Sequence, residues 1–161
     1  MTLNIVILAL VTLQRLGELW LSKRNTKRLL ARGAHETGAA HYPLIVVVHL
    51  LWLGALWWLA PDRRIDVFWL AMFVLLELAR IWVVASLGPR WTTRIIILPE
   101  EPLVRRGPYR LVDHPNYLVV VGEIAVLPLV FGLWQVALVF SALNAAILAV
   151  RIRHENRALG R

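Results

Sequence analysis

Long apolar stretches alternate with short polar segments along this chain, and they set the first expectation for the fold. Five stretches stand out, at residues 3–21, 43–60, 66–87, 117–132 and 133–150. About twenty helical residues cross the hydrocarbon of a bilayer, so the first three stretches are long enough to span it. The pattern predicts an all-α integral membrane fold with five transmembrane helices.

The last two stretches are shorter and nearly adjacent. A helix over residues 117–132 would be about 24 Å long, against a hydrocarbon thickness of about 30 Å. Gly132 separates it from the next stretch with almost no loop, which predicts a tight helical hairpin. Between the apolar stretches, residues 22–42 predict a helical extension and a turn. The β-branched residues within 94–98 predict a short strand.

Positive charge distinguishes the two ends of the predicted bundle. Basic residues follow the first, third and last apolar stretches. The opposite side has only Arg63 and Arg64, offset by Asp62 and Asp66. Because basic loops stay in the cytoplasm, this predicts an N-terminus outside and a C-terminus in the cytoplasm. Residues 88–116 would then form a long cytoplasmic loop.

Composition supports a membrane protein and removes other classes. Of the 161 residues, 59% are hydrophobic, against roughly 45–50% in soluble domains. The net charge is +8, and the basic residues lie between the apolar stretches. We therefore interpret these residues as determinants of topology and as contacts with membrane lipids, not with nucleic acid. Trp20 and Trp91 are expected in the aromatic belt at the inner interface. The chain has no cysteine, so thiolate chemistry is excluded.

Ionisable residues inside the predicted spans suggest a function, because charge in hydrocarbon is costly. Glu77, Arg80 and Glu123 lie near the midplane or in the cytoplasmic half. We therefore predict a polar cavity open to the cytoplasm, with these three residues in a substrate pocket. Two structural alternatives stay open: Glu77 and Arg80 neutralise each other at i, i+3, and Arg15 and Glu18, with the same spacing, snorkel to the interface. Other polar residues of the spans are Gln14, Glu18, His49 and Asn144.

A polar loop and a distant helix end carry the candidate chemistry. Residues 107–117 read GPYRLVDHPNY, and the last apolar stretch ends in RIRHE at residues 151–155. Gly, Pro and Tyr at a helix entrance are also ordinary turn residues, but the distant Arg and Glu favour a site. No metal is predicted, because the histidines lack HxxxH or HExxH spacing. No GxGxxG or Walker loop predicts a nucleotide site.

Residues 102–117, together with 151–155, resemble the isoprenylcysteine carboxyl methyltransferase family of integral membrane enzymes. That family has a Gly-Pro-Tyr, an Arg-His-Pro-x-Tyr, a helical hairpin and then Arg-x-x-x-Glu-Glu. The N-terminal segments QRLGELWLSKRN and GAHETGAAHYP are similar to a small bacterial branch, some of whose members are linked to methylating phenolic polyketide lipids. The resemblance implies one transmembrane methyltransferase domain over residues 1–161 of a bacterial inner membrane protein, with its cofactor-binding part at about 88–161.

The resemblance also implies a cofactor, S-adenosylmethionine, and a lipophilic or prenylated acceptor that enters from the bilayer. Arg151 and Glu155 would be catalytic. Five loop residues would bind the cofactor: Tyr109, His114, Pro115, Asn116 and Tyr117. Two positions depart from the family motif, since Asp113 replaces its Arg and Asn156 replaces its second Glu.

The acceptor group decides the expected mechanism. A carboxylate is already a nucleophile, so Arg151 would hold it bidentately and Glu155 would fix the arginine. A phenol needs deprotonation, and Glu155 or His114 would act as general base. Two other functions stay open at this point: an NADPH-dependent membrane reductase with a similar His-Pro-x-Tyr loop, and a non-catalytic membrane protein.

Overall fold

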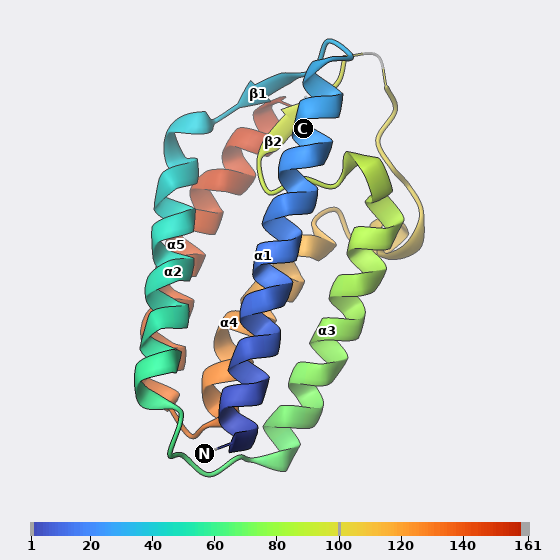
Figure 1. The fold of residues 1–161 in the computed structure, drawn as a ribbon. Coiled ribbons are helices and arrows are strands. Elements are labelled where there is room, and N and C mark those ends of the chain that lie inside the picture. The colour runs from blue at the N-terminus through green and yellow to red at the C-terminus, as the bar shows by residue number, and fades with distance from the viewer. Residues whose placement is uncertain (1, 100, 159–161) are drawn as a thin grey trace.

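The body of the protein is a bundle of α-helices in this computed structural model, which describes residues 2–99 and 101–158 (Figure 1). Within that part of the chain there are five: α1 (Thr2–Leu30), α2 (Tyr42–Leu59), α3 (Val67–Leu87), α4 (Pro115–Val130) and α5 (Trp134–Ala158). The predicted all-α fold is confirmed, and four of the described helical segments are long and apolar enough to cross a membrane. The shorter apolar helix, α4, has 16 residues, so a fifth crossing remains a prediction.

Local sequence explains where several helices begin and end. Asp66 caps α3, because its Oδ1 accepts hydrogen bonds from the backbone N–H groups of Phe68 (2.9 Å) and Trp69 (3.3 Å). Pro115 opens α4, where a missing N–H costs nothing. Gly132, with φ of 68°, reverses the chain between α4 and α5. These two helices form a hairpin joined by residues 131–133.

The apolar core lies at the end of the bundle that carries the N-terminus. Its buried residues include Leu8, Trp52, Phe73 and Leu127 of α1 to α4, and the partly buried Phe140 of α5 packs against them. Burial of this kind contributes about 25 cal/mol per Å² of apolar surface removed from water. Apolar side chains therefore fill the interior at that end of the bundle, and the polar cavity lies at the other end.

The helix α4 lies against α3 and α5, and its approach to α3 depends on a glycine (Figure 1). A Cβ atom added at Gly122 would lie 2.7 Å from Cδ2 of Leu76. At the closed end, Asn4 at the start of α1 donates from Nδ2 to the carbonyl oxygens of Ala60 (2.7 Å) and Arg63 (2.8 Å). These contacts fix α1 to the α2–α3 turn.

The opposite end carries the irregular segments. The strand β1 (His35–Thr37) pairs antiparallel with β2 (Ile95–Ile97), with His35 opposite Ile97. The β2 strand confirms the short strand predicted within residues 94–98, whereas its partner β1 was not predicted. Three short 3-10 helices complete this end: η1 (Ala39–His41), η2 (Gly88–Arg90) and η3 (Gly107–Arg110). The pairing joins the α1–α2 connection to the long loop after α3.

Candidate active site

The loop after α3 is held in place by polar side chains from other helices. Asn25 of α1 donates from Nδ2 to the carbonyl oxygens of Gly88 (3.2 Å) and Trp91 (2.8 Å). Ser22, one turn earlier, accepts the backbone N–H of Thr93 at 2.8 Å. Because Ser22 and Asn25 are both buried, the start of the loop has a fixed position against α1.

The GPY segment of the motif is fixed by a glycine that no other residue could replace without strain. Gly107 has φ of 56°, and a Cβ atom there would lie 2.2 Å from Oγ of Ser86. Next to it, Arg106 donates from Nε to the carbonyl oxygen of Ser86 at 2.6 Å. Tyr109 follows in η3. Burial, together with the nearby Glu155 carboxylate, raises the pKa of Tyr109, so its hydroxyl stays protonated and available as a donor.

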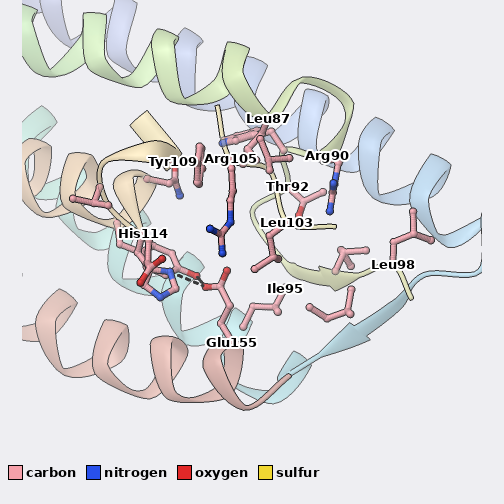
Figure 2. A pocket seen from close by; sticks show the side chains of 18 of the residues that line it. Leu87, Arg90, Thr92, Ile95, Leu98, Leu103, Arg105, Tyr109, His114 and Glu155 are labelled. Carbon is pink, nitrogen blue, oxygen red and sulfur yellow. Dashed lines mark hydrogen bonds and ion pairs between the residues drawn. The ribbon is translucent and has the colours of Figure 1, made fainter. Parts of the chain in front are cut away.

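A large cavity of about 640 Å³ lies beneath this loop (Figure 2). Six of the seven residues predicted to be catalytic or cofactor-binding line it: Tyr109, His114, Asn116, Tyr117, Arg151 and Glu155. The seventh, Pro115, is buried at the start of α4 and is not among the lining residues. Charged residues of both signs and a run of apolar side chains at 95–98 share the wall.

Arg151 and Glu155 are connected through Tyr117. Arg151 donates from Nε to the Tyr117 hydroxyl oxygen at 2.8 Å, and that hydroxyl donates to the Glu155 carboxylate. Arg151 also donates from Nη2 to the carbonyl oxygen of Thr93 at 2.7 Å. The predicted direct contact of Glu155 with the arginine is thus replaced by a contact through a phenol. With Nε and Nη2 both engaged, Nη1 is the freest nitrogen for a ligand.

A second, smaller cavity of about 180 Å³ lies deeper between the helices. Its walls come from all five described helices and are mainly apolar, with side chains such as Val46, Trp52 and Leu148. The two cavities share four lining residues: Trp91, Asn116, Tyr117 and Arg151. The shared wall therefore separates a polar chamber from an apolar one.

Two of the shared residues, Asn116 and Trp91, have side chains that a ligand in either cavity would contact. Oδ1 of Asn116 is buried without a hydrogen-bond partner among the described residues. Trp91 is only 2% exposed, so its predicted place in the interfacial aromatic belt is wrong. Asn25 holds the backbone of this residue inside the protein, and its ring lines both cavities.

Residues 69–161, which contain the long loop after α3 together with α4 and α5, match the isoprenylcysteine carboxyl methyltransferase (ICMT) family. The chain belongs to that family. It is also similar to an uncharacterized protein, YpbQ, of Bacillus subtilis, with 35% identity over 96% of this chain and 95% of the relative. An uncharacterized Haemophilus influenzae protein is 30% identical over 90% of this chain and 88% of its own length. No solved structure matches the chain.

The structure shows where the two residues that depart from the ICMT motif, Asn156 and Asp113, are placed. Asn156, which stands where the family has a second glutamate, accepts a hydrogen bond from Nε2 of His114 at 3.0 Å. The other ring nitrogen, Nδ1, lies 3.7 Å from Oε2 of Glu155. The His114 ring stacks on Tyr117 with centroids 5.3 Å apart. The amide therefore orients the histidine. Asp113, in place of the family arginine, lines the large cavity.

The charges predicted for a substrate pocket mostly have another role. Glu123, 1% exposed, accepts hydrogen bonds from Arg15 of α1 and from Arg80 of α3. Glu77 accepts from Gln14 at 2.5 Å. Glu77 and Arg80 thus bond to Gln14 and Glu123 in place of the pairing of Glu77 with Arg80. Arg15 is paired with Glu18, at 3.0 Å, as well as with Glu123. Arg80 lines the small cavity, but Glu77 and Glu123 are not among its lining residues.

Several residues of the site were not found from the sequence. Trp91 was assigned to the interface, and Thr93 had no signal beyond its place in a loop. Thr93 contacts Ser22, Tyr42 and Arg151. Figure 2 shows the Arg105 side chain directed into the large cavity. It was counted among the topology-determining charges, and within the described residues it forms no ion pair.

Proposed function

We propose that the chain is an integral membrane methyltransferase that uses S-adenosylmethionine to methylate a lipophilic acceptor. The observation that carries the proposal is the wall shared by two cavities of opposite character. A reaction between a water-soluble cofactor and an oily acceptor needs such a meeting point. Family membership supports the same reaction class.

The residues of the large cavity fit the cofactor. Its volume of about 640 Å³ lies within the range of about 300–1,000 Å³ for small-molecule sites. Glu155 and Arg105 offer opposite charges to the ammonium and carboxylate groups of the methionine part. The unpartnered Oδ1 of Asn116 is a free acceptor for a donor on the ligand. The aliphatic run at 95–98 suits the flat adenine.

Bound S-adenosylmethionine supplies a methyl group on a sulfonium, which a nucleophile accepts in a direct displacement. The protein contributes alignment and exclusion of water. Arg151, at the shared wall, would hold a carboxylate or a phenolate through Nη1. For a phenol, the proton would pass to Glu155 or to His114, which lie within 3.7 Å of each other.

The acceptor would enter sideways from the bilayer between α1 and α2. Leu19 of α1 and Leu50 of α2 both line the small cavity and are both exposed on the outside of the bundle. They mark the place where the cavity reaches the surface that lipid would cover. A hydrocarbon tail could remain in the lipid while the head of the acceptor reaches Arg151.

The topology proposed from the charges is consistent with this arrangement. The long loop that lines the large cavity and most of the basic segments lie at the end opposite the N-terminus (Figure 1). We place that end in the cytoplasm of a bacterial inner membrane, where S-adenosylmethionine is made. The N-terminus and the apolar core would face outside, and α4 would be a short fifth crossing accompanied by local thinning of the bilayer.

The size of the small cavity favours one of the two candidate acceptors. An engineered apolar cavity of about 150 Å³ holds one benzene ring, and this cavity measures about 180 Å³. A single phenolic ring fits this volume, and its tail would remain in the lipid. We therefore favour O-methylation of a phenolic lipid over carboxyl methylation of a prenylated cysteine.

Calorimetric titration of the purified protein in nanodiscs with S-adenosylmethionine, S-adenosylhomocysteine and NADPH tests the reaction class. We expect the first two to bind and NADPH not to bind. NADPH binding alone would select the reductase, and no binding at all would select a non-catalytic protein. Transfer of a labelled methyl group to a pentadecyl phenol and to N-acetyl-S-farnesyl-cysteine then identifies the acceptor.

A matched pair of variants tests the assignment of the arginine. Arg151→Ala should abolish methyl transfer, because it removes the cation at the shared wall. Arg153→Ala, on the same helix but exposed, should retain it. Equal activity of the two variants would show that Arg151 is not needed.

A further inference from the structure

Thr93, in the loop after α3, is hydrogen-bonded to three helices at once. Its backbone N–H donates to Oγ of Ser22 in α1 at 2.8 Å. Its own hydroxyl oxygen lies 2.8 Å from that same Oγ and 2.9 Å from the hydroxyl of Tyr42, at the start of α2. Its carbonyl oxygen accepts a hydrogen bond from Nη2 of Arg151 in α5 at 2.7 Å. The N–H, the hydroxyl and the carbonyl oxygen of this one residue are therefore all engaged.

The contacts of Thr93 come from distant parts of the chain. Ser22 is 71 residues away in the sequence, Tyr42 is 51 and Arg151 is 58. Thr93 lies in an irregular segment between η2 and β2, so no helix or sheet ladder holds its backbone. The direction of its carbonyl group therefore depends on the two hydroxyl groups of α1 and α2.

The Thr93 carbonyl is one of two contacts that orient the Arg151 guanidinium. The other is the Tyr117 hydroxyl, to which Nε of Arg151 donates at 2.8 Å. A guanidinium group is planar, so hydrogen bonds from two of its nitrogens fix its plane and the direction of the third. In the proposed reaction that third nitrogen, Nη1, holds the acceptor oxygen. Without the Thr93 contact, the group could turn about its bond to Tyr117.

We propose that Thr93 is a positioning residue for methyl transfer, held by Ser22 and Tyr42 and acting through Arg151. This inference rests on the proposed function, because it concerns the arginine of that same site. Ser22 and Tyr42 precede residues 69–161, the segment that matches the ICMT family, so α1 and α2 contribute to the geometry of the site. Methyl transfer depends on alignment, and a misplacement of about 1 Å can cost roughly 100-fold in rate.

Tyrosine NMR in detergent micelles tests the positioning without any methyl transfer. The chain has three tyrosines, at positions 42, 109 and 117, and isotopic labelling of Cζ gives one signal for each. Within the described residues, the hydrogen bonds of Thr93 reach Tyr117 only through Arg151. Thr93→Val removes the hydroxyl and keeps the shape. It should shift the Tyr117 signal, because the arginine moves, and leave the signal of Tyr109 in place.

Kinetics tests the consequence for the reaction. With pentadecyl phenol as the acceptor, Thr93→Val should lower kcat about tenfold, the effect of one buried hydrogen bond. The affinity for S-adenosylhomocysteine should stay at the wild-type value, since Thr93 lines the small cavity and is not among the lining residues of the large one. Thr93→Ser keeps the hydroxyl and should restore both kcat and the Tyr117 signal. A purely structural role would lower Tm and cofactor affinity together.

Thr26→Val is the matched control. Thr26 lies in α1, one turn from Ser22, and its Oγ1 is buried without a partner among the described residues. The same substitution there should change neither the Tyr117 signal nor kcat. Tyr42→Phe is the second variant, in case Thr93→Val does not fold. It removes one of the hydroxyls that hold Thr93 and should shift the Tyr117 signal in the same direction by a smaller amount.

The outcomes separate the positioning role from the proposed reaction. If the Tyr117 signal stays in place in Thr93→Val, or in Tyr42→Phe where only that variant folds, the role of Thr93 is overturned even in an active methyltransferase. A shift of equal size in Thr26→Val, a failure of Thr93→Ser to reverse it, or a shift with unchanged kcat would also overturn the proposal. A shift that Thr93→Ser reverses, in a protein whose wild type transfers no methyl group, would support the positioning of Arg151 and contradict the proposed reaction.

Discussion

The carboxylate of Glu123 is the place where one substitution should reveal how the bundle is held together. It accepts hydrogen bonds from Arg15 and Arg80, on two other helices, and is itself 1% exposed. Glu123→Gln keeps the shape and removes the charge. The variant would leave two arginines in the bundle interior with their main counter-ion lost.

The expected loss of stability in Glu123→Gln depends on the ion pairs that Arg15 and Arg80 keep. Removing one partner of a buried ion pair costs about 3–5 kcal/mol. Glu18 still lies 3.0 Å from Arg15 and 3.5 Å from Arg80, so part of the compensation survives and the lower end applies. A loss of about 3 kcal/mol lowers the Tm of a chain of this size by roughly 6–12 °C.

Thermal unfolding in detergent, followed by circular dichroism, measures this loss. Glu36→Gln is the matched control, because it breaks the ion pair with Arg94, whose side chain is 41% exposed. Exposed pairs contribute about 0–1 kcal/mol, so this variant should unfold close to the wild-type temperature. If both variants lost the same amount, the buried cluster would not stabilise the bundle. If Glu123→Gln instead lost activity with an unchanged Tm, the result would support the role of Glu123 in a substrate pocket.

Three further predictions concern the loop and the cavities. Tyr117→Phe removes the hydroxyl between Arg151 and Glu155, the two residues proposed to be catalytic, and should lower kcat about 10–100-fold with cofactor affinity little changed; steady-state kinetics would contradict this if kcat stayed at the wild-type value. Leu50→Trp should narrow the entry and raise KM for a long-tailed acceptor more than for a short-tailed one, whereas Leu51→Trp, exposed and not among the lining residues, should not discriminate. Gly107→Ala should lower Tm and the affinity for S-adenosylhomocysteine, because its positive φ alone costs about 1–2 kcal/mol; Gly17→Ala, in open space within α1, should not.

Most of the fold was predictable because the length of an apolar stretch indicates a helix that can cross a membrane. The five stretches fall on the five described helices, and α1 continues to Leu30 as the predicted helical extension. The extension is helical beyond the apolar run because Ser22 and Asn25 are buried against the loop. The strand β1 has only three residues, His35–Thr37, with too little β-branched character to be seen without its partner.

Only the motif residues of the candidate site were predictable from the sequence. The motif residues lie around one cavity, because the segment 107–117 and the end of α5 meet there. The partners of the buried charges were not predictable in the same way. Glu123 is bonded to Arg15, which is 108 residues away in the sequence, and helical spacing relates only residues on one helix.

The partners of the buried arginines, rather than their burial, distinguish structure from function here. Arg80 is bound by the carboxylate of Glu123, so its charge is compensated and it can hold helices together. Arg151 is nearly as buried, at 8% exposed, but its direct partners are a phenol and a backbone carbonyl. Neither neutralises its charge. A buried cation with neutral partners keeps its attraction for an anion, and Arg151 lies on the wall that both cavities share. The arginine most able to bind an anionic acceptor is therefore the one placed where the acceptor and the methyl donor would meet.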